Sequence, residues 1–152
     1  MTDTPPVLKI SRPMPATAAR VFAAWTTAED LRGWFAPFPF TAPEAVVEPK
    51  VGGRFEVCMA GPDGSRMWTR GTITALEPDA AISLDLGAHG PDGTRLFGAA
   101  TEARITAQPM GCLLSVTQSY TPGPACPPGV FAGAEMGWTA ALMQLATLVM
   151  RG

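Results

Sequence analysis

The sequence between residues 44 and 120 repeats one pattern, in which short segments of alternating apolar and polar residues are separated by turn-forming clusters. Two of these clusters, at 61–64 and 90–93, have the same sequence, Gly-Pro-Asp-Gly. Proline presets φ at the second position of a β-turn, and glycine tolerates the conformation that follows. Turns this short join antiparallel neighbours, whereas parallel strands need long crossovers. The pattern predicts antiparallel strands at 44–49, 53–60, 66–76, 80–87, 96–107 and 112–120.

The residues before this region predict one further strand and two helices. Residues 7–14 alternate in the manner of a strand, which Pro13 or Pro15 should end because proline cannot donate to a sheet. Residues 16–25 place their large apolar side chains on one helical face. Thr27 and Asp30 have the spacing of a capping box, which would start a second short helix ending at Gly33.

The last part of the chain predicts a stiff connector followed by a long helix. Residues 121–131 contain four prolines and two glycines, so they cannot form regular structure. At 100° per residue, residues 134–151 carry an apolar stripe that should face the sheet. This stripe consists of Trp138, Leu142, Leu145 and Val149. The opposite side carries Met136, Met143 and Met150.

The order of these elements predicts a single α+β domain over residues 1–152. A chain of this length is long enough to bury one substantial core. About seven antiparallel strands with one long C-terminal helix should form a curved sheet that wraps around the helix. The two short helices after the first strand complete this architecture, and the inward side chains would line either a core or a cavity.

Composition argues against several classes of function. The formal net charge is −2, and the 11 basic residues are scattered singly, so we expect no nucleic-acid partner. No segment approaches the roughly 18 apolar residues of a membrane span, and the N-terminus does not have the pattern of a signal peptide, so we expect no membrane insertion. Three widely spaced cysteines are typical of a reduced, cytoplasmic protein. Because the chain has one histidine, His89, and no metal-binding spacing, we predict neither metal nor cofactor.

Four motifs in order resemble a known family. They are ARVFAAWTTAEDLRGWFAP from residue 19, EPKVGGRF from residue 48, PDGSRMWTRGTITALEP from residue 62, and Gly137-Trp138 followed by spaced leucines. The set resembles the START-like (SRPBCC) helix-grip superfamily, in the branch homologous to the C-terminal domain of the heat-shock-protein-ninety ATPase activator. The resemblance implies a hydrophobic cavity between the sheet and the last helix. Relatives bind lipids, sterols, plant hormones or polyketides, and some cyclise polyketides.

The parity of the last strand selects two polar residues for such a cavity. Gln118 and Tyr120 share a face with Leu114 and Val116, so they should point inward and orient a ligand. The full set of predicted cavity residues is Trp25, Trp34, Phe35, Phe55, Trp68, Arg70, Leu114, Val116, Gln118, Tyr120, Trp138 and Leu142.

Two of the predicted positions leave alternatives open. Arg70 shares its parity with Trp68 and, if inward, could hold a carboxylate or enolate; a bulge near Gly71 would change this. Otherwise Arg70 would be solvated or paired with Glu56 or Glu102 on a neighbouring strand. His89, next to a turn, is predicted to be an exposed loop residue rather than a catalytic base.

Three functions follow as hypotheses. The first is binding of a small apolar or aromatic ligand without evident catalysis. The second is an enzyme of the polyketide cyclase or hydratase type, in which Gln118, Tyr120 and Arg70 orient the substrate. The third is a protein-interaction module resembling the chaperone activator. In addition, the methionines at 136, 143 and 150 could form a homodimer interface, because methionine adapts to irregular apolar contacts.

Overall fold

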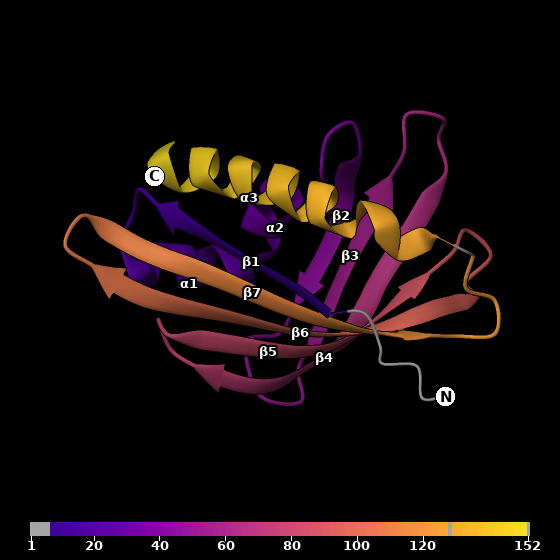
Figure 1. Cartoon of the computed structure of the whole chain (residues 1–152), viewed down its shortest axis with the longest axis horizontal. Helices are drawn as coiled ribbons and strands as arrows, with labels where there is room; N and C mark the ends of the chain where they lie inside the picture. Colours follow the sequence, from indigo (N-terminus) through magenta and orange to yellow (C-terminus); the bar gives the residue numbers. More distant parts are fainter. Residues whose placement is uncertain (1–6, 128, 152) are drawn as a thin grey trace.

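The computed structural model of the chain describes residues 7–127 and 129–151 (Figure 1). The first strand is followed by two short helices, then by six strands, a short 3₁₀ helix and one long helix. In chain order these are β1 (Val7–Met14), α1 (Ala18–Thr26), α2 (Ala28–Trp34), β2 (Thr41–Val47), β3 (Arg54–Ala60), β4 (Arg66–Glu77), β5 (Ala81–His89), β6 (Arg95–Gln108), β7 (Gly111–Pro122), η1 (Val130–Gly133) and α3 (Ala134–Arg151).

The seven strands form one antiparallel sheet in the order β1-β7-β6-β5-β4-β3-β2. The strands from β2 to β7 each pair with the next strand along the chain, whereas β1 pairs with β7. The sheet curves, and α3 lies across its concave side together with α1 and α2 (Figure 1). The predicted α+β helix-grip architecture is therefore confirmed, and short hairpin turns account for the antiparallel order.

Several boundaries differ from the predicted ones. β2 begins at Thr41 rather than at residue 44, and β5 extends to His89, which pairs with Trp68 instead of lying in a loop. β1, by contrast, has the predicted bounds, Val7–Met14, with Pro13 inside the strand and Pro15 just after it. Proline is tolerated there because β1 is the edge strand, where its missing N–H need not serve a second neighbour.

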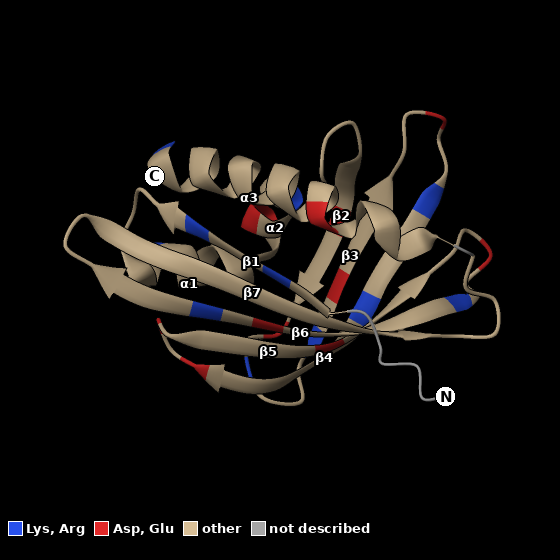
Figure 2. Cartoon of the chain, viewed as in Figure 1, with Lys and Arg blue, Asp and Glu red and all other residues tan. Residues whose placement is uncertain are grey.

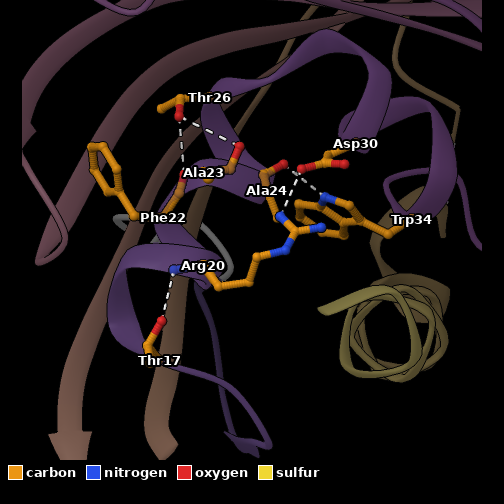
Figure 3. Close-up of polar contacts among 8 residues, drawn as sticks. All are labelled: Thr17, Arg20, Phe22, Ala23, Ala24, Thr26, Asp30 and Trp34. Carbon is orange, nitrogen blue, oxygen red and sulfur yellow. Dashed lines mark hydrogen bonds and ion pairs between the residues drawn. The ribbon is translucent and has the colours of Figure 1, made fainter. Parts of the chain in front are cut away.

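The capping chemistry of the two short helices differs from the prediction. Thr17 caps α1 by accepting a hydrogen bond from the Arg20 backbone N–H at 3.2 Å (Figure 3). Thr27 makes no side-chain cap at α2, and Asp30 instead forms an ion pair with the Arg20 side chain at 2.8 Å. The predicted capping box is therefore wrong, because the Asp30 carboxylate pairs with Arg20 of α1 instead. The indole N–H of Trp34 donates to the Ala24 carbonyl at 3.0 Å and joins α2 to α1 (Figure 3).

The predicted gripping face of α3 is confirmed in most of its members. Leu142, Leu145 and Val149 are buried, whereas Trp138 is half-buried. The helix packs against β1, α1 and α2. Its charges are confined to Glu135 and Arg151, so most of its length is uncharged (Figure 2). Burial of this apolar stripe, at about 25 cal/mol per Å², holds the helix on the sheet.

Gln144 fixes α3 to the loop that follows α2. Its side-chain N–H groups donate to the carbonyl oxygens of Trp34 at 3.1 Å and Ala36 at 2.9 Å. Its side-chain oxygen accepts a hydrogen bond from the backbone N–H of Phe38 at 2.8 Å. One side chain thus satisfies three backbone groups of a loop that has few sheet hydrogen bonds of its own.

Candidate functional site

A cavity of about 520 Å³ lies between the sheet and the first half of α3. Its wall comes from the loop after α2, the inner faces of β3 to β7, the connector before α3, and α3 itself. The lining residues are Phe35, Pro37, Phe40, Met59, Met67, Thr69, Leu86, Gly87, Ala88, Leu96, Phe97, Ala99, Gln118, Tyr120, Pro127, Val130, Phe131, Gly133, Ala134, Gly137, Trp138 and Ala141.

The wall has small side chains on the parts of the sheet and of α3 that face each other, which leaves space between them. Ala88 and Ala99 lie on the inner faces of β5 and β6, and Ala134 and Gly137 face them from α3. Phe40, Met67 and Pro127 are lining residues that are also exposed, so they mark the mouth of the cavity. The cavity therefore opens to solvent near the start of α3.

Crowding by neighbouring atoms does not explain why residue 137, inside a helix, is a glycine. A Cβ added there would have only one neighbour, a Pro37 side-chain atom at 3.8 Å, which is an ordinary contact. The sheet therefore does not approach this position closely. The missing side chain adds space to the cavity instead.

A line of hydrogen bonds runs through the cavity wall. The indole N–H of Trp138 donates to the side-chain oxygen of Gln118 at 3.0 Å. The Gln118 amide donates to the Thr101 hydroxyl at 2.8 Å, and that hydroxyl donates to the Ala99 carbonyl at 3.1 Å. Because an indole N–H can only donate, it sets which end of the Gln118 amide faces α3. The three hydrogen bonds therefore all point the same way, from α3 through β7 to β6.

Tyr120 is held among aromatic rings. Phe131 stacks on its ring with centroids 4.6 Å apart, and Phe97 meets it edge-on at 5.9 Å. The side chain is 3% exposed, and its hydroxyl has no hydrogen-bond partner among the described residues. Burial raises the pKa of Tyr120 to about 12, and the nearby indole N–H of Trp138 offsets part of that rise. The hydrogen bond of that indole goes to Gln118, so Tyr120 is a neutral side chain with an unused donor.

The structure separates the predicted cavity residues into three groups. Phe35, Gln118, Tyr120 and Trp138 line the cavity. A second group is buried in the core and does not belong to the wall. It consists of Trp25, Trp34, Phe55, Leu114, Val116 and Leu142. Contact of the first group with a ligand stays a prediction.

The third group, Trp68 and Arg70, lies on the outer face of the sheet, so their prediction as cavity residues is wrong. Their neighbours on β4, Met67 and Thr69, point into the cavity instead. Arg70 is exposed, and its guanidinium lies 4.4 Å from the centre of the Trp68 ring. The bulge in β4 occurs at Thr74 rather than near Gly71, so it does not bring Arg70 inward.

Of the alternatives left open for an outward Arg70, solvation is the one observed, and the side chain forms no ion pair with Glu56 or Glu102. Arg70 and Glu56 are opposite each other in the β3–β4 register. The Glu56 carboxylate, however, pairs with Arg54 at 3.0 Å on its own strand. Arg70 is left to stack on the neighbouring tryptophan, an arrangement worth about 0.5–1 kcal/mol at an exposed site.

Sequence reasoning missed several residues that shape the site. Phe97 and Phe131 complete the aromatic surroundings of Tyr120, and Gln144 holds the loop that carries Phe35. The inward parity of Phe97 could have been read from the alternation of β6, because Ala99 and Thr101 share its face. The position of Phe131 had no comparable signal, since it follows an irregular proline-rich connector.

A second depression, of about 460 Å³, lies on the outer face of the sheet. It is lined by residues of β4 to β7, among them Thr74, Asp85, Glu102 and Ser119. These side chains are polar and largely solvated. The long helix α3 lies on the concave side of the sheet (Figure 1), away from this depression, which is a shallow feature of the strand surface rather than an enclosed site.

Over residues 7–127 and 129–151 no helix has the length and apolarity needed to cross a membrane. The same residues contain no group of three or more His, Cys, Asp or Glu side chains placed to hold a metal ion. The three cysteines are free, with Cys58 and Cys112 buried.

Comparison with known families decides the affiliation of the chain. The sequence model described as "Activator of Hsp90 ATPase homolog 1-like protein" matches residues 15–150. The chain belongs to the AHSA1-like family. This result confirms the resemblance to the helix-grip superfamily that the motifs indicated, and it covers both short helices, the strands from β2 to β7 and nearly all of α3.

Solved structures give the same fold for this AHSA1-like protein. Protein CV1439 from Chromobacterium violaceum is 24% identical with a TM-score of 0.82, over 95% of this chain and 98% of that chain. A protein from Rhizobium leguminosarum is also 24% identical, with a TM-score of 0.83 over 97% and 95%. An AHSA1-like protein from Aeromonas hydrophila is 22% identical, with a TM-score of 0.73 over 96% and 93%. No curated protein matches the sequence.

Proposed function

We propose that this AHSA1-like protein binds a small hydrophobic or aromatic ligand in the cavity between its sheet and α3. The observation that carries the proposal is a largely apolar cavity of about 520 Å³ with a few polar groups, Thr69, Gln118, Tyr120 and Trp138, in its wall. Ligand sites in proteins typically measure about 300–1,000 Å³ and combine apolar walls with a few placed polar groups. The geometry therefore matches that of a small-molecule site.

The charge of the wall favours an uncharged ligand over a charged one. Every lining side chain is neutral at neutral pH, and Tyr120 is the only one that titrates in the accessible range. Burying an unpaired charge in apolar surroundings costs several kcal/mol. Lipids with apolar chains and polycyclic phenols are the classes that fit these surroundings.

Binding is better supported than catalysis of the cyclase or hydratase type. A general acid or base works best when its pKa lies near the working pH, and Tyr120 has a pKa of about 12. Arg70, which was expected to orient a substrate, lies outside the cavity. The side chains of the wall are suited to hold a molecule and to orient one polar atom of it.

The proposal is tested with gently purified protein by native mass spectrometry and by a thermal-shift screen of lipids and polycyclic phenols. Binding to the native state raises the unfolding temperature by mass action, by an amount that depends on ligand concentration. We expect at least one class to raise it in a saturable way. A screen in which neither class binds or shifts the unfolding temperature would sink the proposal.

A matched pair of variants shows whether binding occurs in this cavity. Ala88 lies half-buried in the wall, between Thr69 and Phe97 in the sheet register, so Ala88→Leu should fill part of the space. Ala100 is exposed on the outer face of β6, so Ala100→Leu adds the same atoms elsewhere. We expect weaker binding with the first variant and unchanged binding with the second. Equal effects of the two would place the ligand outside the cavity.

The remaining predictions on partners and location stay proposals. The three free cysteines support a reducing compartment such as the cytoplasm. A chaperone partner is tested by affinity capture with purified chaperone rather than with a lysate, and specific capture would favour an interaction module over a ligand carrier.

A further inference from the structure

Three buried polar atoms lack a hydrogen-bond partner among the described residues, and only one of them belongs to the cavity wall. These atoms are Nε of Arg12, Nε1 of Trp25 and the hydroxyl oxygen of Tyr120. Arg12 and Trp25 do not line the cavity, whereas Tyr120 does. Leaving a buried donor without an acceptor costs about 1–3 kcal/mol, so such atoms are rare in native proteins. An unpaired hydroxyl in the wall of a cavity is explained when a bound ligand supplies its hydrogen-bond partner.

We propose that the cavity selects a neutral, mainly aromatic ligand that presents one carbonyl-type acceptor oxygen to the Tyr120 hydroxyl. This inference rests on the proposed function and narrows it to a class of ligand. It commits to an acceptor rather than a donor on the ligand, and to an aromatic body rather than a flexible hydrocarbon chain.

The hydrogen-bond directions around Tyr120 call for an acceptor. The oxygen of Gln118 already accepts the Trp138 N–H, and one N–H of the Gln118 amide donates to Thr101. A glutamine amide has two such hydrogens, so Gln118 keeps a further N–H donor, and it lines the same cavity as Tyr120. The indole of Trp138 also lies on the side of the Tyr120 oxygen. This end of the cavity is therefore rich in donors, and a carbonyl oxygen complements it.

The rings of the wall favour an aromatic body. Phe35, Phe40, Phe97, Phe131 and Trp138 all line the cavity. Phe35 meets Trp138 edge-on at 5.9 Å, and Phe97 meets Phe131 edge-on at 5.0 Å. Edge-to-face packing of rings contributes about 0.5–1.5 kcal/mol beyond the area that it buries. A planar ligand between these rings would extend contacts that the protein already makes.

The Tyr120 hydroxyl is closed to water in this structure, because less than 1 Å² of its oxygen is accessible. Phe131, which stacks on the Tyr120 ring, is itself half-buried and comes from the short η1 helix. A ligand that reaches the hydroxyl must displace the side chains that cover it. Since no water has to be displaced from the oxygen, the new hydrogen bond is a net gain once the ligand is in place.

The test compares three molecules of the same ring size by isothermal titration calorimetry. They are 2-acetonaphthone, which has a carbonyl acceptor, 2-ethylnaphthalene, which has none, and 2-naphthoate, which is charged. The wild-type protein is compared with Tyr120→Phe, which keeps the ring stacking and removes only the unsatisfied hydroxyl. Ser119→Ala on the outer side of the same strand is the matched control, because it removes a hydroxyl away from the cavity.

We expect the affinity ratio of the ketone to the hydrocarbon to fall about threefold to tenfold in Tyr120→Phe, which corresponds to one neutral hydrogen bond. Ser119→Ala should keep the wild-type ratio, and the naphthoate should bind most weakly. An unchanged ratio in Tyr120→Phe, tighter binding of the naphthoate, or binding of lipids with none of the three naphthalenes would overturn the inference while the proposed function stands. If none of the three naphthalenes, the lipids or the phenols binds, both this inference and the proposed function are contradicted.

Discussion

The indole N–H of Trp138 donates a hydrogen bond of 3.0 Å to the side-chain oxygen of Gln118, and this bond joins the first half of α3 to the inner face of β7. Both residues also line the cavity. From Leu142 onward α3 is held by the buried side chains of Leu142, Leu145 and Val149, whereas its first turns have an open space next to them. One polar pair therefore bridges the helix and the sheet where apolar packing is thinnest.

Trp138→Phe and Gln118→Leu should each destabilise the protein by about 1–3 kcal/mol, because each leaves the other group buried without its partner. The double variant should cost less than the sum of the two single variants. We expect a coupling energy of about 1 kcal/mol in urea unfolding. Additive effects would show that the pair contributes nothing as a pair, and Thr139→Ala on the exposed side of α3 serves as the control.

Gln144→Ala should loosen the loop that forms one side of the cavity. Its amide makes hydrogen bonds to the backbone of Trp34, Ala36 and Phe38, and their loss should cost about 1–3 kcal/mol. Hydrogen exchange of the Phe38 amide should become faster. Gln108→Ala, at the exposed end of β6, should change the free energy of unfolding by less than about 0.5 kcal/mol. Unchanged exchange at Phe38 in Gln144→Ala would contradict the clamp.

Truncation on the two sides of α3 should have unequal effects. Leu142 is buried against the sheet, so Leu142→Ala should lower the free energy of unfolding by about 2–5 kcal/mol. Met143, the next residue, is 53% exposed, so Met143→Ala should change it by less than about 0.5 kcal/mol. Urea unfolding measures both, and a cost at Met143 near that at Leu142 would show that its face is covered.

The parts of the site that could be predicted are those that follow from strand parity. Gln118 and Tyr120 were placed inward because they alternate with Leu114 and Val116, and β7 has no register shift that breaks the alternation. The same reasoning chose the wrong face of β4, where apolar Met67 and aromatic Trp68 compete for the inner face. There the aromatic residue lies outside and stacks with the exposed Arg70.

Alternation also cannot distinguish a core residue from a cavity residue. Val116 and Tyr120 share the inner face of β7 and are both buried, yet only Tyr120 lines the cavity. The difference depends on how far α3 stands from the sheet at each point, which is a long-range property. The role of Gln144 was unpredictable for a similar reason, because its partners lie more than 100 residues away in the sequence.

The exposed methionines of α3 test the predicted self-association. Met136, Met143 and Met150 are 79%, 53% and 67% exposed, so their placement on the outer side of the helix is confirmed. A dimer through this face stays a prediction. Met143→Glu should then lower the mass found by sedimentation velocity, because it places a charge in an apolar contact. An unchanged mass in a folded variant would remove the dimer through this face.

The stability of the protein should fall at high pH through the ionisation of Tyr120. The pKa of this side chain is about 12 in the folded chain, against about 10 for an exposed tyrosine in the unfolded chain. Burial raises it because the charged tyrosinate is poorly solvated inside the protein. Between these two values the unfolded chain loses the proton and the folded chain keeps it. The stabilisation is thus complete below about pH 10 and is lost as the pH rises through about 12.

The loss should reach roughly 2–3 kcal/mol, from two pKa units at about 1.4 kcal/mol each. Because Tyr120 is the only tyrosine of the chain, the ultraviolet absorbance of tyrosinate reports its ionisation directly. Urea unfolding at several pH values, compared with Tyr120→Phe, separates its contribution from every other effect of high pH. The wild-type protein should lose stability more steeply than the variant. Parallel curves would mean that the hydroxyl is as well solvated in the folded chain as in the unfolded one.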